Sequence, residues 1–427
     1  FWWTCHRKTP FSFLKPSSMN PHRVMCLILP TLAFSMMWTW TLSEEVWQDC
    51  YDTVREVIRK PMFGIIGAKL MHDNENNSTG FVYSDAKIFN KLFILLLISS
   101  NDTRKNIKQF LGMSNDKRCA LGRACSAFED LMYDISHYRN KVSYKSIVYV
   151  FPDLEIESLV FSCTKFKNVK FTLHPSHVLL KINSEYAGHM KFTSSSYLKK
   201  HLDPTTDFFL LDTLMMREGF FGDIKLINSD IPFKDYDDKT QEITWVRTTR
   251  EVWISDTFPP PGRNKYSCEY VRLIRSQLGD ENLYMFYVQP VLKGLTPEEK
   301  MRCFLRIFAN FEEYIKIAQN ISSSGKSYHS LAVPLMDVST EFNLKHVLKR
   351  SMPELFEKDQ ITYLYKGTKH TLNELWTWEN YNNKPHSPKV ASRESDTKST
   401  VFLDSPFVFT LMEINLNTIL KTGVFLR

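Results

Sequence analysis

The order in which two kinds of hydrophobic periodicity occur along this chain restricts the folds open to it. Apolar residues recur with helical spacing mainly in the first part, whereas short strand-like runs dominate the second. Because secondary structure packs in layers, this order predicts an α+β fold, with helices covering one large mixed or antiparallel sheet in a single domain. The predicted helices are Val46–Leu70, Ala86–Leu97, Arg104–Leu111 and Thr296–Ala318. The predicted strands are Ser146–Phe151, Phe208–Met216, Asn282–Val291, Leu331–Val338, Ile361–Tyr365, Pro406–Ile414 and Thr418–Leu426.

Composition excludes several classes of protein. Hydrophobic residues make up 43% of the 427 positions, and the 31 Phe, 18 Tyr and 9 Trp side chains require burial, which excludes a disordered chain. The net charge of +7 comes largely from residues 1–43, which hold four basic and no acidic side chains. The remaining residues carry 50 basic and 47 acidic side chains. Such a balance, without a basic stripe, argues against a nucleic-acid partner.

The first 43 residues have the pattern of a targeting segment. Met19 is followed by a short polar stretch with one basic residue, then by the apolar run Val24–Phe34 and by small residues. This succession is typical of a secretory signal peptide at 19–43, and the run is too short for a membrane span. The alternative is an ordinary buried helix. Residues 1–18 contain no Met and are expected to be an untranslated or non-native extension, with 44–427 as one domain.

Two further features agree with export. Asn-x-Ser/Thr triplets, which are acceptors for N-glycosylation, occur in polar surroundings. Beyond the leader the number of cysteines is even, without a CxxC spacing or a nearby His pair, so we expect one to three disulfides and no metal site. The acceptors are Asn76, Asn77, Asn101 and Asn320. The cysteines are Cys50, Cys119, Cys125, Cys163, Cys268 and Cys303.

Three groups of residues, in one order along the chain, carry a resemblance to a known family. They are Ser84–Thr103, then Ala332–Pro334 with Glu341–Leu344 and Met352–Phe356, and finally Phe402–Phe409 with Asn417–Leu420 and Gly423. Together they resemble motifs of the serpins, with Ser405 in place of the usual arginine of the C-terminal signature. The resemblance implies the serpin fold, with a large central sheet, further sheets, about eight or nine helices and an exposed reactive loop. It also predicts burial of Leu92, Leu95, Phe356, Phe407 and Phe409.

The resemblance also implies a zone in which the central sheet opens. Asp212 stands where serpins use an asparagine to hydrogen-bond across that zone, and Ser84 keeps the neighbouring hydroxyl. An ionised carboxylate can accept hydrogen bonds there but cannot donate one. His370 is expected at the histidine position of the strand that leads to the reactive loop. The alternative for His370 is an ordinary solvated histidine at a strand end.

The reactive loop, expected at 379–400, departs most from the family pattern. Serpin inhibitors trap a protease by inserting the cleaved loop as a strand into their own sheet, which requires small side chains and a complete set of backbone donors. The expected hinge contains no alanine, and Pro385 and Pro388 each remove a donor, so we expect insertion to fail. The hinge residues are Glu379, Asn380, Tyr381, Asn382, Asn383, Lys384 and Pro385. The candidate scissile region holds Lys389, Arg393, Glu394, Ser395 and Asp396.

No catalytic or cofactor motif supports an enzyme, so none is predicted and no cofactor is expected. The basic runs Lys199-Lys200-His201 and Lys165–Lys170 could bind a polyanion weakly, although such runs are commonly solvated faces. The sequence therefore predicts a secreted, monomeric, non-inhibitory serpin that binds or carries a small ligand or acts as a decoy. The alternative is an inhibitor that traps an extracellular serine protease through the 379–400 loop.

Overall fold

Helices and strands both contribute to the structure, which we describe from a computed structural model, so the predicted α+β class is confirmed. Residues Cys50–Arg427 form one compact unit. The structure describes residues 48–58, 63–73, 79–113, 121–139, 142–150, 155–156, 165–170, 175–186, 208–216, 224–227, 229–248, 252–258, 270–278, 282–321, 326–328, 330–384 and 400–427.

The helices lie mostly in the first half of this unit. Each of the two longest predicted helices, Val46–Leu70 and Thr296–Ala318, is divided into two helices in the structure. The second is divided at Asn310, which ends α8 and precedes α9. The helices are 48–58, α2 (Phe63–Asp73), α3 (Asp85–Ile98), α4 (Asn101–Phe110), α5 (Leu121–Arg139), α6 (Pro175–Tyr186), α8 (Pro297–Ala309), α9 (Phe311–Gln319) and α10 (Leu344–Leu348), with a 3-10 helix at Pro353–Phe356.

Side-chain caps fix where two of these helices begin. Ser84 precedes α3, and its Oγ accepts a hydrogen bond from the backbone N–H of Lys87 at 3.4 Å. Thr296 and Glu299 form a reciprocal capping box at α8, with Pro297 at the first helical position. Each cap satisfies backbone donors that have no partner inside the helix.

A seven-stranded antiparallel sheet is the largest in the described residues. Its strand order is β1-β18-β17-β11-β10-β9-β12, so the two late predicted strands pair with each other as its second and third strands. Phe407 and Phe409 are buried there, which confirms two of the predicted core positions. The strands are β1 (Gly80–Tyr83), β9 (Val252–Phe258), β10 (Val271–Gln277), β11 (Leu283–Pro290), β12 (Lys326–Tyr328), β17 (Phe407–Glu413) and β18 (Thr418–Phe425).

Four smaller sheets complete the described strands. One is β3-β2-β4, with β3 (Lys165–Asn168), β2 (Val142–Val150) and β4 (Phe208–Met216). A second pairs β14 (Asp337–Asn343) with β15 (Trp376–Asn382). A third is β16-β13-β8-β5, with β16 (Thr400–Phe402), β13 (Ser330–Pro334), β8 (Trp245–Thr248) and β5 (Ile224–Ile227). The last pairs β6 (Phe233–Lys234) with β7 (Thr240–Gln241).

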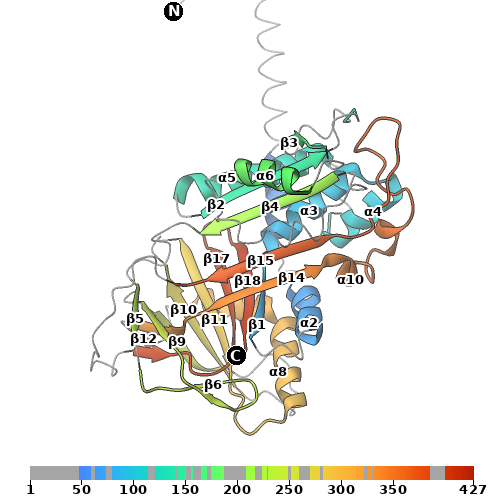
Figure 1. The fold of residues 1–427 in the computed structure, drawn as a ribbon. Coiled ribbons are helices and arrows are strands. Elements are labelled where there is room, and N and C mark those ends of the chain that lie inside the picture. Colours follow the sequence, from blue (N-terminus) through green and yellow to red (C-terminus); the bar gives the residue numbers. More distant parts are fainter. Residues whose placement is uncertain are drawn as a thin grey trace, which may run out of the picture. The chain divides into compact units, whose positions relative to one another are not determined.

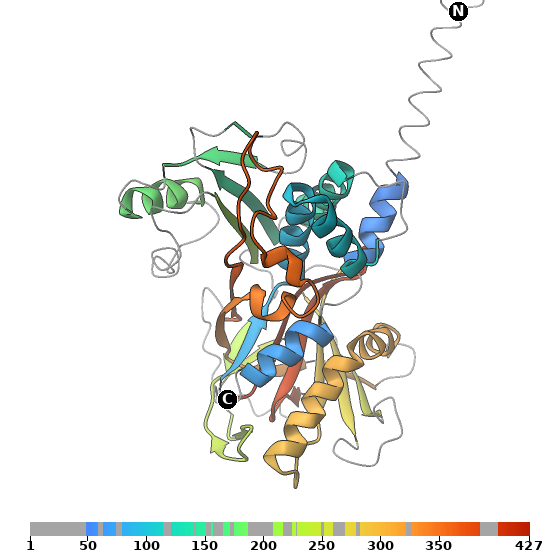
Figure 2. The same cartoon turned by 90° about the vertical axis from the view of Figure 1, so that its right-hand side faces the viewer.

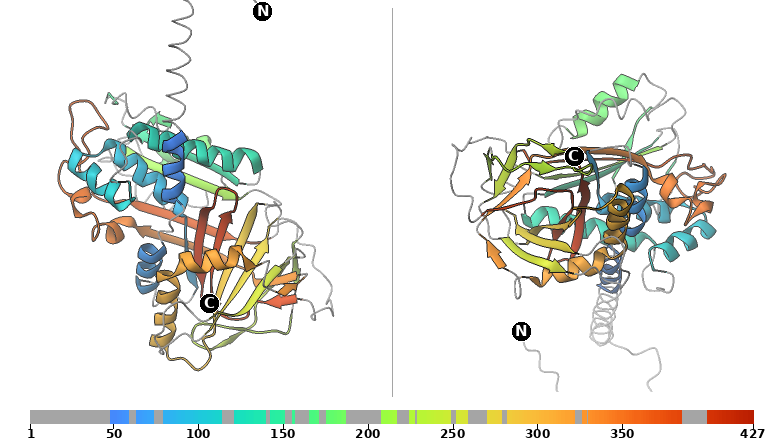
Figure 3. Two further views of the ribbon diagram at one scale, coloured as in Figure 1. Left: turned by 180° about the vertical axis from the view of Figure 1, so that it is seen from behind. Right: turned by 90° about the horizontal axis from the view of Figure 1, so that it is seen from below.

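Helices cover both faces of the β3-β2-β4 sheet. In Figure 1, β2, β4, β15 and β14 follow one another across the upper part of the unit. Figure 2 shows α6 on one side of this layer and α3 with α5 on the other. Seen from behind in Figure 3, α3 and α5 lie together, in agreement with their contacts. Helix α2 packs against α8, where Gly67 lies close to the ring of Phe308.

Three expectations about local structure were wrong. Leu331–Val338 is not one strand, because the chain leaves β13 after Pro334 and enters β14 at Asp337 in a different sheet. Ile361–Tyr365 forms only isolated bridges. Leu92 and Leu95 are buried as predicted, but Phe356 is only half-buried, because the 3-10 turn directs Leu355 into the core instead.

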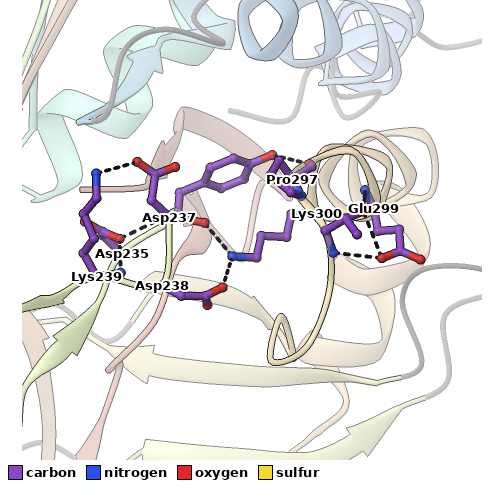
Figure 4. Close-up of polar contacts among 9 residues, drawn as sticks. Asp235, Asp237, Asp238, Lys239, Pro297, Glu299 and Lys300 are labelled. Atoms are coloured by element: carbon purple, nitrogen blue, oxygen red, sulfur yellow. Dashed lines mark hydrogen bonds and ion pairs between the residues drawn. The ribbon is translucent and has the colours of Figure 1, made fainter.

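The turn between β6 and β7 is fastened to the start of α8 (Figure 4). Asp235 is buried, and its carboxylate accepts the backbone N–H of Lys239 at 2.8 Å. Lys300 reaches back from α8, donating to the carbonyl of Tyr236 at 2.6 Å and pairing with Asp238 at 2.7 Å. Since these charges find their partners within the turn and α8, the cluster has a structural explanation.

Three of the six cysteines beyond residue 43 lie within the described residues. Cys50, Cys125 and Cys303 are buried and disulfide-bonded, which requires at least two disulfides and agrees with the predicted one to three. The other three predicted cysteines lie outside the described residues. Within the described ranges, no helix has the length and apolarity needed to span a bilayer.

Candidate functional site

Strands β4 and β15 face each other across a break in the strand pairing. β4 pairs with β2 on one side and β15 pairs with β14 on one side, and no ladder joins β4 to β15 in the described residues. We call these two neighbouring edges the β4–β15 junction. Side chains alternate along each strand, so the junction has an inner face toward α3 and an outer face toward α6.

On the inner face, Asp212 of β4 is fully buried and held by α3. Its Oδ2 pairs with Lys91 at 2.7 Å, and its Oδ1 accepts from the side-chain amide of Asn90 at 2.5 Å. The same Asn90 amide donates to Ser146 of β2 at 2.9 Å. Because both partners of Asp212 are donors, a carboxylate suits this position.

Glu379 of β15 is the second buried carboxylate of the inner face. It pairs with Lys87 of α3 at 2.7 Å and with Lys421 of β18 at 2.5 Å. Lys87 also donates to the carbonyl of Trp378, and Lys421 to that of Asn380. All three ionised side chains are at most 4% exposed, so removing any one of them would leave an uncompensated charge in the interior.

Aromatic side chains close the outer face. Trp376 and Trp378 of β15 and Phe209 of β4 pack against one cluster of buried apolar residues. That cluster combines residues of β2, β4 and α6, together with Val169 after β3. The two strands therefore share packing on the outer face although they share no ladder. Its members are Ile147, Tyr149, Val169, Val178, Leu179, Ile182 and Leu211.

Asn383 fastens the end of β15. Its backbone N–H donates to the carbonyl of Met336 at 3.3 Å, and its side-chain oxygen accepts the N–H of Met336 at 2.8 Å. Its side-chain amide donates to the carbonyl of Pro334 at 2.9 Å, and the residue is 1% exposed. These bonds fix the chain at the point where it leaves the sheet.

Searches of sequence and of structure give different answers. Models of known protein families give no match, and neither do curated protein sequences. Solved structures match over nearly the whole chain. Native protease nexin-1 with heparin superposes with a TM-score of 0.66 at 14% identity, covering 88% of this chain and 99% of the other.

Two further structures agree. A tumour-suppressing serpin gives a TM-score of 0.66 at 13% identity, and the mouse protein-Z dependent protease inhibitor gives 0.63 at 12%. Each match covers 88% of this chain and 99% of the other. This chain has the serpin fold.

Of the three residues predicted for the opening zone, two lie beside the first half of α3 and one does not. Ser84 and Asp212 both adjoin α3: the Ser84 hydroxyl donates to the carbonyl of Leu420 at 2.8 Å, and Asp212 binds Lys91, about two turns further along. His370 lies elsewhere. It bridges Ile361, which also bridges Ser99 at the opposite end of α3, roughly 20 Å from Ser84 at 1.5 Å per helical residue.

The first four residues of the predicted hinge lie in a strand and not in a loop. Glu379, Asn380, Tyr381 and Asn382 belong to β15, where Glu379 and Tyr381 are buried. The ring of Tyr381 packs on Phe409 with centroids 4.8 Å apart. These residues form a strand because every second side chain of β15 points inward, where Glu379 is held by its ion pairs and Tyr381 by its packing on Phe409. Exposed Lys384 ends the described part, whereas Pro385, Pro388 and the candidate scissile residues lie outside it.

The remaining predicted site residues have mixed outcomes. Asn101 and Asn320 are exposed, at the start of α4 and the end of α9, and Asn76 and Asn77 lie outside the described residues. Among the described residues there is no group of three His, Cys, Asp or Glu side chains that could hold a metal ion.

The basic run Lys165–Lys170 meets the end of α6. Lys167 pairs with Glu185 at 3.0 Å, and Lys145 of β2 donates to the Glu185 carbonyl. Burial lowers the pKa of Lys145, Glu185 opposes this, and the neighbouring Lys165 and Lys167 lower the pKa further. Part of this basic charge thus caps a helix C-terminus. The run at 199–201 lies outside the described residues.

Four residues of the junction were not predicted from the sequence, namely Lys87, Asn90, Lys91 and Lys421. A signal for two of them was present. Lys87 and Lys91 stand four residues apart within an otherwise apolar helix, and buried lysines require a partner. The acidic partners lie more than 100 residues away, so the sequence alone could not name them.

Acid should destabilise the protein through Glu379. Burial by itself raises the pKa of Glu379, but Lys421 and Lys87 outweigh it and hold the pKa below its ordinary value of 4.5. Such a group contributes stability that is present above about pH 4.5 and is lost as the pH falls through the folded pKa. We expect the Tm, measured by calorimetry, to fall in this range and the fall to be shallower in Glu379→Gln. Equal slopes in both proteins would contradict this.

Proposed function

We propose that this protein is a secreted, glycosylated member of the serpin family that binds or carries an extracellular partner without trapping a protease. The observation that carries the proposal is at the end of β15. Asn383 is fixed there by its hydrogen bonds to Met336 and Pro334, and Pro385 and Pro388 follow almost at once. No catalytic role is proposed for any residue.

Insertion makes demands that this segment does not meet. The cleaved loop would have to turn back after β15 and add a strand between β4 and β15, with backbone N–H groups bonded to its neighbours. Proline has no such donor, so Pro388 would break the ladder near its beginning. The turn itself would disturb the bonds of Asn383, and unpaired buried groups cost about 1–3 kcal/mol each.

The junction offers a second obstacle to insertion. A strand entering between β4 and β15 must separate Lys91–Asp212 from Lys87–Glu379 on the inner face. It must also displace Trp376 or Trp378 from the outer apolar cluster. Both steps cost free energy that offsets the gain from new ladder bonds. This cost supports the proposal that the loop stays out of the sheet.

Three observations support export. Buried Cys50, Cys125 and Cys303 are disulfide-bonded, and such bonds persist in oxidising compartments. Asn101 and Asn320, both glycosylation acceptors, are exposed. The leader-like segment 19–43 has the charge and length of a signal peptide.

The alternative function is inhibition of a serine protease. Residues 385–399 join β15 to β16, which lie in different sheets, and they include Lys389 and Arg393, after which trypsin-like proteases cleave. One structure with the same fold is that of a protease inhibitor by name. Under this alternative, a protease recognises residues 385–399 as a substrate and cleaves a peptide bond among the candidate scissile residues.

Cleavage of residues 385–399 should leave the Tm nearly unchanged. An inserted strand adds ladder bonds and apolar burial and therefore raises the Tm, whereas a loop that stays outside adds neither. The protein is incubated with trypsin-, chymotrypsin- and elastase-like proteases, then examined by calorimetry and by denaturing gel electrophoresis. We expect clipped protein and no covalent complex.

A stable complex, or a large rise in Tm after cleavage, would restore the inhibitor function. The cause is tested by Pro385→Ala/Pro388→Ala, with and without Asn383→Ala. If the proline changes alone allow the Tm to rise after cleavage, the missing donors are the barrier. If the rise needs all three changes, the fastening at Asn383 contributes as well. If the Tm rises after cleavage in none of these variants, the barrier to insertion lies in the β4–β15 junction.

A further inference from the structure

Strand β14 has one long edge without a strand partner in the described residues. In Figure 1 it follows β15 at the border of the upper layer, and the only strand that pairs with it in the described part of the chain is β15. Its residues, Asp337–Asn343, pair with β15 in one continuous register without a bulge. An open strand edge presents a row of backbone N–H and C=O groups, so it can pair with another chain.

The hydrogen bonds at the two ends of the β14–β15 ladder show which backbone groups of β14 point outward. The N–H of Asn383 donates to the carbonyl of Met336 at 3.3 Å, and that of Leu344 donates likewise to the residue opposite it. In an antiparallel ladder only every second residue bonds its partner, so the even-numbered residues of β14 face β15. The backbone N–H and C=O groups of Asp337 and Ser339 therefore point to the open side.

The usual protections of an edge strand are missing from β14. Edge strands resist pairing when they are short or carry lysine, proline or a bulge. The other described edge strands away from the β4–β15 junction have at most four residues, and β3, β5 and β12 among them also carry lysine. β14 has seven residues and contains neither lysine nor proline. Among the described edges, that of β14 is therefore best suited to binding an extended segment.

The side chains along β14 indicate what kind of segment fits this edge. Asp337, Ser339 and Glu341 are exposed on the outer face, and the residues between them are buried. Opposite charges on neighbouring strands attract, so the two carboxylates favour a strand with basic residues four positions apart. A second copy of β14 fits less well, because antiparallel pairing centred on Ser339 sets Asp337 against Glu341, and like charges directly opposite each other repel.

From this arrangement we propose that the open edge of β14 binds an extended basic segment of a partner protein as an added strand. The backbone of Asp337 and Ser339 supplies ladder bonds, and the exposed carboxylates select basic side chains on the outer face. This proposal names the kind of partner for the binding role proposed above and rests on that role. The cleavage experiment tests that role and the experiments below test the edge, so each can fail separately.

A synthetic peptide, Lys-Val-Thr-Val-Lys-Val-Thr, serves as the probe, and calorimetric titration measures its binding to the intact protein. Its lysines match the spacing of Asp337 and Glu341. The same peptide with glutamate in place of lysine should bind at least about tenfold more weakly. A version methylated at alternate backbone nitrogens, which cannot form the ladder, should be weakened as much. Equal binding of all three peptides would overturn the proposal.

Substitution of Ser339 tests the edge in the protein itself. Ser339→Pro removes an outward N–H, and proline is tolerated on the open side of an edge strand. We therefore expect the lysine peptide to bind about tenfold more weakly while the Tm stays nearly unchanged. Ser339→Ala keeps the N–H and should bind the peptide as the wild type does.

Two results with these variants would contradict the proposal. One is unchanged binding of the lysine peptide by Ser339→Pro. The other is self-association of the wild-type protein, measured by sedimentation, that Ser339→Pro abolishes, because the added strand would then come from a second copy. If Ser339→Pro fails to fold, the methylated peptide and the wild-type protein decide the matter.

Discussion

Replacing Glu379 by leucine should lower the free energy of unfolding by about 3–5 kcal/mol, because it leaves buried Lys87 and Lys421 without their carboxylate. Glu379→Gln keeps the shape and should lose nearly as much. Urea denaturation followed by circular dichroism measures both. Glu312→Gln, which removes an exposed pair with Lys316, is the matched control and should not change the unfolding midpoint.

Two further substitutions should rescue the stability that Glu379→Leu loses. Removing all three charges together, in Lys87→Met/Glu379→Leu/Lys421→Met, should restore most of the stability, since well-packed apolar residues can replace a buried ionic group. A Glu379→Leu protein as stable as the wild type would show that the lysines reach water or another acceptor. A triple variant no better than the single one would mean that the site cannot repack.

Substituting Gly423 by valine should cost about 3 kcal/mol or more, through crowding rather than charge. A Cβ at this position of β18 would lie 2.5 Å from the ring of Phe409 and 2.7 Å from the backbone oxygen of Phe81. Neither can retreat easily, because Phe409 is buried under Tyr381 and Phe81 belongs to the neighbouring strand. Calorimetry should show the loss as a lower Tm.

A second variant separates the two clashes. Phe409→Leu removes the outer part of the ring, so adding it to Gly423→Val should recover part of the loss, leaving the clash with the Phe81 backbone. Purely additive losses in the double variant would contradict crowding against the ring.

Local patterns predicted the elements whose periodicity is strong. The apolar run of α3 and the largely apolar segments of β17 and β18, which are buried throughout, agree nearly with their predicted bounds. Trp376–Asn382 also alternates, yet its residues from Glu379 onward fall within the expected reactive loop, because the resemblance places the hinge there. Its strand character depends on partners on β14, about 40 residues earlier, and on Lys421. Such long-range partners leave no local trace.

The junction was the least predictable part for the same reason. A sequence shows that Lys87 and Lys91 interrupt an apolar helix, but it does not show which acids they meet. His370 was misplaced because a single histidine has no pattern of its own, whereas its real neighbours, Ile361 and Thr368, are set by a local bridge.

The strand order of the largest sheet has a consequence for how the protein folds. β1 has β18 as its ladder partner, and the Ser84–Leu420 bond beside it joins residues 336 positions apart. β1 therefore cannot be joined to β11 until the last strands have left the ribosome, and β11 must wait with one edge unpaired. Contacts this distant in sequence make for slow folding and expose strand edges to aggregation. Newly made chains should consequently depend on chaperones until residue 425 is available.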